Sequence, residues 1–165
     1  MKMDIIIRKA QKEDFETISG LLLQIAKIHR QGRPDLFKDN AGKYSREEFF
    51  KILEDGTKPV FVAQDTDTEQ VLGYAFCSIN VYEERPVLKG YKSLYLDDLC
   101  VDETFRGAGV GKRIIGFLKE YAKNAGCYNM ELNVWECNPE AVSFYDRNGF
   151  TSQRRRLEWI IENEE

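Results

Sequence analysis

The sequence predicts an α/β protein with a central sheet of mixed strand direction and helices on both faces. Stretches rich in β-branched or alternating apolar residues are interspersed with stretches whose apolar residues recur at helical spacing. Strands follow one another in the middle of the chain, whereas helices and strands alternate in its last third. The 165 residues are 42% hydrophobic and 32% charged. These values are typical of a globular protein, and we expect residues 1–165 to form a single domain.

The first half of the chain is predicted to begin with a strand and two helices. Residues 4–9 contain a β-branched run that indicates the strand. Apolar residues recur at helical spacing over 14–29, and the Gly- and Pro-containing segment 31–37 indicates a loop. Ser45 to Glu48 fits the capping-box pattern, which predicts a short helix that ends at about Leu53.

Strands are predicted to dominate the middle of the chain. Residues 59–64 and 71–82 read as two strands joined by a polar turn, and we expect them to form an antiparallel hairpin. A charged loop at 83–91 then leads to a third strand at 93–101.

The last third is predicted to alternate between helices and strands. Asn138 and Pro139 suit the cap and first position of a helix. The elements are a glycine-rich loop at 106–111, a helix that ends near Gly126, a strand at 129–135, a helix at 138–147 and a last strand at 152–161. The complete predicted order is β-α-α-β-β-β-α-β-α-β.

Composition argues against several classes of partner. The net charge of −4 disfavours a dedicated nucleic-acid binder, and we do not interpret the basic run at 154–156 as a nucleic-acid site. The apolar runs are far shorter than the ~20 residues that a membrane span needs, so we expect no membrane partner. The first residues do not resemble a signal peptide, and we therefore expect a cytoplasmic location.

Cysteine and histidine spacing predicts no metal site. The four cysteines form no CxxC pair, and we expect them to be small buried hydrophobes. His29 is the only histidine, so a Ser-His-Asp triad would have to use it. We expect this residue to lie on the surface or in the core rather than to act in catalysis.

The glycine-rich loop has the features of a phosphate-binding site. Glycines such as Gly107 and Gly109 let the backbone approach a ligand, and the N-terminus of the following helix favours an anion. A Walker loop is excluded because Arg106 and Arg113 occupy positions that require Gly and Ser or Thr. A dinucleotide fingerprint is excluded because Lys112 replaces its last glycine. A tight loop with packing glycines remains the alternative.

Arg106, Gly109 and Gly111 fit the pattern R-x-x-G-x-G directly after a predicted strand. This pattern resembles the acetyl-coenzyme A signature of the GNAT N-acetyltransferase superfamily. The sequence from Leu132 to Phe150 is similar to the second half of the family, and the RPDLF segment at 33–37 is similar to a branch that acetylates diamines, other small amines and proteins. The resemblance implies the GNAT acyl-CoA N-acyltransferase fold, a mostly antiparallel mixed sheet flanked by helices, with acetyl-CoA as cosubstrate and no metal.

The resemblance also implies which residues bind coenzyme A. Backbone amides of the glycine-rich loop would hold the pyrophosphate, and the preceding strand would pair with the pantetheine arm like an added strand. The side chains of Arg106 and Lys112 would add charge or be merely solvated, and Asn138 would bond the pantetheine or only cap its helix. The implied set is Leu99, Val101, Arg106, Gly107, Gly109, Gly111, Lys112 and Asn138.

Acetyl transfer to an amine requires proton movement, because an alkylammonium with a pKa of ~10.4 has no free lone pair. Tyr145 matches the family position of the acid that protonates the thiolate. Alternatively, Phe144 and Tyr145 are both packing residues of an amphipathic helix, although helix phase is not expected to place both rings on one face. Asp97 matches the position of a base-like Glu in relatives, acting directly or through water. Alternatively it is a positioning or structural carboxylate. Strand alternation predicts that only one of Asp97 and Asp98 reaches the site.

The sequence indicates the acceptor-binding residues less specifically than the coenzyme-binding residues. Carboxylates and a tryptophan ring would suit a cationic amine, although Glu83 and Glu84 also fit a solvated loop. The candidate acceptor residues are Asp35, Glu83, Glu84, Asp97 and Trp135. We favour a small primary amine as acceptor. The alternatives are a protein lysine or N-terminus, or a catalytically silent coenzyme A sensor. The resemblance further implies a homodimer formed through C-terminal strands.

Overall fold

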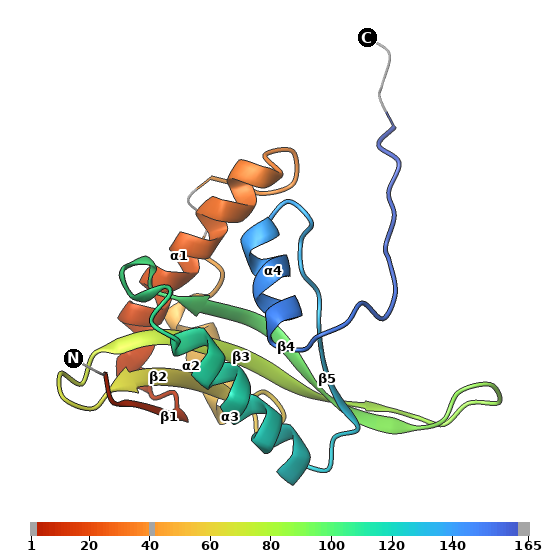
Figure 1. Cartoon of the computed structure of the whole chain (residues 1–165), viewed down its shortest axis with the longest axis horizontal. Helices are drawn as coiled ribbons and strands as arrows, with labels where there is room; N and C mark the ends of the chain where they lie inside the picture. The colour runs from red at the N-terminus through yellow and green to blue at the C-terminus, as the bar shows by residue number, and fades with distance from the viewer. Residues whose placement is uncertain (1–2, 40–41, 162–165) are drawn as a thin grey trace.

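Five strands form one sheet in which they lie side by side in the order of the sequence (Figure 1). The computed structural model describes residues 3–39 and 42–161. Neighbouring strands are antiparallel except for the last two, which are parallel, so the predicted mixed and mostly antiparallel sheet is confirmed. The strands are β1 (Ile5–Lys9), β2 (Val60–Asp65), β3 (Val71–Tyr82), β4 (Tyr91–Val101) and β5 (Asn129–Leu132).

The helices begin where local capping signals predict. The Ser45 hydroxyl accepts a bond from the Glu48 amide at 3.2 Å, and the Glu48 carboxylate accepts one from the Ser45 amide at 2.7 Å. The Asn138 side chain accepts a bond from the Ala141 amide at 3.2 Å. These bonds satisfy amides that a helix terminus leaves unpaired. The helices are α1 (Phe15–Gly32), α2 (Arg46–Glu54), α3 (Val110–Asn124) and α4 (Pro139–Arg147), with short 3-10 turns η1 (Lys12–Asp14) and η2 (Glu103–Phe105).

Each face of the sheet packs against its own apolar cluster. On β2, Phe61 and Ala63 belong to the cluster that α3 covers, whereas Val60 and Val62 belong to the cluster that α1 and α2 cover. The two sets alternate because successive strand residues point to opposite faces. Helices therefore lie on both faces of the sheet, as the sequence predicts.

The strand predicted at 152–161 is wrong. Residues 150–161 form neither helix nor strand, and this C-terminal tail extends away from the rest of the molecule (Figure 1). Leu157 is 87% exposed and Trp159 is 90% exposed. The alternating pattern of the tail indicates a strand, but strand formation also requires a neighbouring edge, and the tail pairs with none in the described part of the chain.

Among the described residues, we find no helix with the length and apolarity that crossing a membrane requires.

The antiparallel pairing of β3 with β4 continues to Tyr82 and Tyr91, so these two strands form a long hairpin that projects from the sheet (Figure 1).

Leu118 tests the packing of α3 on the sheet, because its side chain is fully buried in the cluster beneath that helix. We expect Leu118→Ala to lower the free energy of unfolding by ~2–5 kcal/mol, since the truncation leaves a cavity. Leu36→Ala is the matched control, because Leu36 is 53% exposed. Urea denaturation measures both variants. Equal effects of the two substitutions would contradict this packing.

Candidate active site

β4 and β5 diverge at the centre of the molecule. Their pairing ends at Leu96 and Leu132, where β5 stops, while β4 continues to Val101. In the described structure, the edge of β4 over 97–101 that faces away from β3 has no strand beside it. A cavity of about 890 Å³, here the first cavity, is lined by Leu99, Cys100 and Val101 of this segment. An unpaired strand edge presents amide and carbonyl groups that can bind an extended ligand.

The glycine-rich loop forms the opposite side of the first cavity. Gly107 and Gly109 have φ values of 78° and 86°, which glycine adopts at little cost. Gly109 caps α3, whose first amides have no partner within the helix. The first residues of α3, Val110, Gly111 and Lys112, line the cavity. A Cβ on Gly111 would lie 3.0 Å from the Phe144 ring, so this glycine permits close packing of α3 against α4. The arrangement suits a bound anion.

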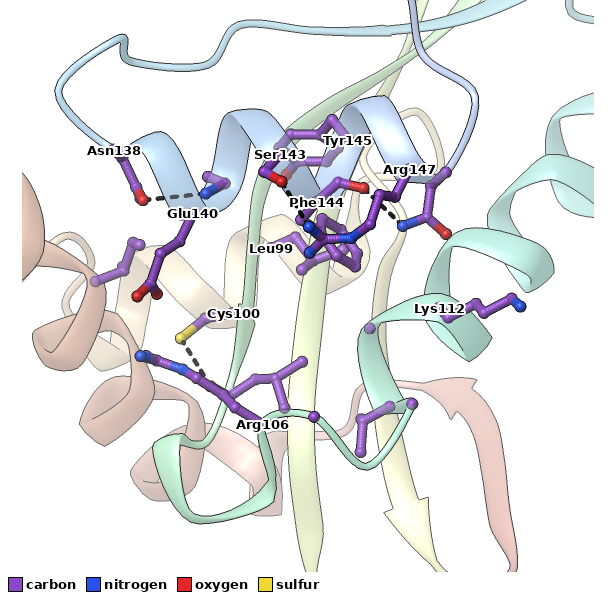
Figure 2. A pocket seen from close by; sticks show the side chains of 18 of the residues that line it. Leu99, Cys100, Arg106, Lys112, Asn138, Glu140, Ser143, Phe144, Tyr145 and Arg147 are labelled. Carbon is purple, nitrogen blue, oxygen red and sulfur yellow. Dashed lines mark hydrogen bonds between the residues drawn. The ribbon is translucent and has the colours of Figure 1, made fainter.

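The structure places all the residues predicted to bind coenzyme A around the first cavity (Figure 2). The Arg106 side chain bonds the Val101 carbonyl at 3.4 Å, so it holds the loop to the end of β4. Lys112 lies in the first turn of α3. The set that lines the cavity is Leu99, Val101, Arg106, Gly107, Gly109, Gly111, Lys112 and Asn138.

Arg147 is a cationic lining residue that sequence reasoning missed. It bonds the Ser143 hydroxyl at 2.5 Å, and both side chains lie on the cavity side of α4 (Figure 2). Their four-residue spacing is the signal that places them on one helix face. Together with Arg106 and Lys112, Arg147 gives the first cavity a cationic rim suited to phosphate groups.

A second cavity of about 390 Å³ adjoins the first. Its lining includes the aromatic rings of His29, Phe37 and Trp135. It also includes the charged side chains of Lys43, Asp97 and Asp98. Five residues line both cavities: Ile25, Leu99, Asn138, Ala141 and Tyr145. Groups bound in the two cavities would therefore meet beside Tyr145.

The prediction that only one of Asp97 and Asp98 reaches the site is wrong. The Lys43 ammonium donates to Asp97 at 2.8 Å and to Asp98 at 3.0 Å, and both carboxylates line the second cavity. The cause is a β-bulge: Phe76 pairs with Asp98 and Cys77 pairs with Leu96, so Asp97 is an extra residue that breaks the alternation.

Burial and charge distinguish the groups in this cluster. Asp98 is 11% exposed and also accepts a bond from the buried Tyr74 hydroxyl at 3.2 Å, whereas Asp97 is 41% exposed. Burial by itself would lower the pKa of Lys43, but the negative charges of Asp98 and Asp97 outweigh it and raise that pKa. Lys43 is therefore a permanent cation at neutral pH.

Tyr145 projects from α4 to the junction of the two cavities. Burial, reinforced by the negative charge of Asp98, raises the pKa of its phenol above the ordinary value. The phenol consequently stays protonated at neutral pH and can donate a hydrogen bond. The Phe144 ring lies 5.2 Å from the Tyr145 ring and also lines the first cavity, so the expectation that helix phase separates these rings is wrong. Of these two aromatic residues, Tyr145 lines both cavities and Phe144 lines the first.

Three of the predicted acceptor residues lie outside both cavities. Asp35 is half-exposed and paired with Arg33, which also pairs with Glu158 of the tail. Glu83 and Glu84 are exposed in the loop of the projecting hairpin. Assigning these three to the acceptor pocket is therefore wrong, because none of them lines it, whereas Asp97 and Trp135 do.

In the described part of the chain, the cysteines and the other metal-ligand types form no cluster suited to a metal. Within residues 3–39 and 42–161, no three His, Cys, Asp or Glu side chains gather as a metal site. Cys77 and Cys100 are buried, and burial raises the pKa of each thiol to about 12. Cys127 and Cys137 are half-buried, which differs from the buried state expected.

Comparison with known proteins identifies relatives of this sequence. Residues 22–150 match the model of the acetyltransferase (GNAT) family. A thialysine N-epsilon-acetyltransferase from Mus musculus is 39% identical over 157 residues, which cover 93% of this chain and 88% of that protein. Glucosamine 6-phosphate N-acetyltransferase 1 from Oryza sativa subsp. japonica is 31% identical over 98 residues, or 59% of this chain. The match spans 56% of the rice protein, so the chain corresponds to about half of its length.

A solved structure shares the arrangement of the whole sheet and its helices. The crystal structure of a mutant of the BH1408 protein from Bacillus halodurans has a TM-score of 0.91 and 29% sequence identity. The superposition covers 95% of this chain and 99% of that one.

Gly109 tests the anion-binding role of the loop, because its φ of 86° strains any other residue. We expect Gly109→Ala to cost ~1–2 kcal/mol in the loop conformation and to weaken coenzyme A binding ~10-fold. Gly116→Ala is the matched control, since Gly116 lies within the same helix with no atom within 4 Å of an added Cβ. Calorimetric titration with coenzyme A measures both. Unchanged affinity of Gly109→Ala would contradict the role.

Proposed function

The chain belongs to the acetyltransferase (GNAT) family, and we propose that it is an enzyme that transfers the acetyl group of acetyl-CoA to a small primary amine. The observation that carries the proposal is the meeting of two cavities at Tyr145. One cavity offers an unpaired strand edge and a helix N-terminus, and the other offers carboxylates and aromatic rings. A thioester and an amine bound in them would come together at one place.

Acetyl-CoA suits the first cavity by its chemistry. Its pyrophosphate would accept bonds from the first amides of α3, beside the cationic side chains of Arg106 and Lys112. Its pantetheine arm carries amides, which can pair with the free edge of β4 at Leu99 and Val101. Bound in this way, acetyl-CoA supplies an activated acyl group.

We assign Tyr145 the role of acid. Its phenol remains protonated at neutral pH and lies where the two cavities meet. A neutral donor at this position can give a proton to the departing sulfur.

The second cavity supports a small cationic acceptor. The carboxylates of Asp97 and Asp98 attract an ammonium, and Trp135 adds a ring face for it. Of the roles open to Asp97, we propose positioning of the acceptor rather than proton removal, because Asp97 is hydrogen-bonded to Lys43. A volume of about 390 Å³ suits a small molecule better than a protein segment. The acceptors named for the mouse and rice relatives, thialysine and glucosamine 6-phosphate, are also small amines.

We further propose that the protein is a homodimer whose C-terminal tails pair with a second copy. The tail exposes four large apolar side chains, which pairing with a second copy would bury: Leu157, Trp159, Ile160 and Ile161. Residues 1–165 would then form one acetyltransferase domain per subunit. The cytoplasmic location remains a prediction from the sequence.

Tyr145→Phe tests the acid role. We expect kcat to fall ~10²-fold or more because the variant has no proton to give, while coenzyme A still binds. Thiol release from acetyl-CoA is measured with thialysine, lysine, 1,3-diaminopropane and glucosamine 6-phosphate, with a blank for the cysteines of the protein. Tyr121→Phe is the control, since Tyr121 lies on α3 outside both cavities.

Two outcomes would contradict parts of this proposal. A Tyr145→Phe rate within ~3-fold of wild type would exclude the acid role. Coenzyme A binding by wild type without turnover of any amine or of a lysine peptide would favour the sensor. Turnover of the peptide alone would favour a protein acetyltransferase.

Light scattering after size exclusion tests the dimer. We expect a mass of about twice the 19.2 kDa of one chain. Replacing Leu157 and Trp159 together by Ala should shift the protein towards the monomer, because these side chains would be buried against the partner. A wild-type protein that is monomeric at ~100 μM would rule out a stable dimer.

A further inference from the structure

His29 lines the second cavity, whereas its sequence context predicts a surface or core position without a role in catalysis. Its imidazole projects from α1 and is half-buried. The ring centre lies 5.1 Å from that of Phe37 and 6.5 Å from that of Trp135, and these two rings contact each other edge to face at 5.3 Å. The imidazole therefore packs against one ring from the segment that follows α1 and one ring from a distant part of the chain, and the three rings form one wall of the cavity.

The two carboxylates of the cavity are already hydrogen-bonded. Asp97 and Asp98 both receive hydrogen bonds from the Lys43 ammonium, and Asp98 receives another from Tyr74. An imidazole ordinarily titrates near ~6.5, which matches proton transfer at neutral pH. Tyr145 is protonated and cannot serve as the base.

We propose that His29 is the catalytic base that takes the proton from the acceptor amine. The inference rests on the proposed function. An acceptor that binds as an ammonium first gives one proton to the free nitrogen of the imidazole, which releases it to water. As the resulting amine nitrogen forms its bond to the acetyl carbon and the carbon–sulfur bond breaks, its second N–H proton passes to the imidazole. The sulfur takes the phenol proton of Tyr145, and the imidazolium then loses its proton to water while the phenolate regains one.

The charges around His29 keep it ready to accept a proton. Burial lowers the pKa of His29, and the negative charge of Asp98 on β4 opposes this effect. The positive charge of Lys43 lowers the pKa further, so it lies below its ordinary value. Asp97 on β4 and the protonated Tyr145 on α4 also line the cavity. The imidazole is therefore neutral at pH 7, and activity that depends on it should decline as the pH falls through that pKa and the imidazole becomes charged.

His29→Gln tests the proposal, with kcat/KM measured against pH for the best amine of the panel. We expect a ~10²-fold decrease at pH 7 and loss of the acidic limb of the profile, with coenzyme A affinity within ~3-fold of wild type. His29→Ala should recover activity as free imidazole is added, because the truncation leaves room in the cavity. A purely structural role would not produce this rescue.

Asp97→Asn is the matched control for the identity of the base. We expect it to raise the KM for a cationic amine and to retain the acidic limb. If Asp97→Asn instead abolishes the limb, or if His29→Gln keeps both rate and limb, the assignment to His29 is overturned while the acetyltransferase proposal stands. If wild type turns over no amine, both fail together.

Discussion

The separation of β4 from β5 is the constraint on which the site depends. Their hydrogen bonds stop at Leu96 and Leu132, yet β4 continues for five residues beside β3. Its free edge would be a liability in an ordinary sheet, because unpaired amides and carbonyls lose hydrogen bonds when buried. Here the edge borders a cavity that is also lined by the glycine-rich loop and α4 (Figure 2). A ligand with its own amides can satisfy these groups.

The bulge at Asp97 determines the chemistry next to this edge. It directs two adjacent carboxylates to one ammonium, that of Lys43. The second cavity therefore has charged groups in its lining as well as the rings of Phe37 and Trp135. The negative charge of Asp98 acts to raise the pKa of both His29 and Tyr145. At neutral pH the cavity holds a neutral imidazole and a protonated phenol. In the proposed reaction, His29 accepts a proton from the amine and Tyr145 gives one to the sulfur.

Much of this arrangement is encoded locally and could be predicted. Capping at Ser45 and Asn138 and the glycines of the loop depend on neighbours in the sequence, and the structure reproduces them. The bulge could not be predicted, because it depends on register with β3. The sequence pattern of the C-terminal tail indicates a strand, but it does not show which other strand would pair with it. His29 and Lys43 join the site only through tertiary contacts of α1 and of the segment before α2, so no local spacing identified them.

Hydrogen exchange of backbone amides, with and without coenzyme A, tests the central claim most directly. If the free edge of β4 and the first turn of α3 hold the coenzyme, exchange over 97–101 and 109–112 should slow at least ~10-fold on binding, while β1 is unaffected. Saturating coenzyme A that leaves exchange in both segments unchanged would contradict the claim that the diverging strands form its binding site.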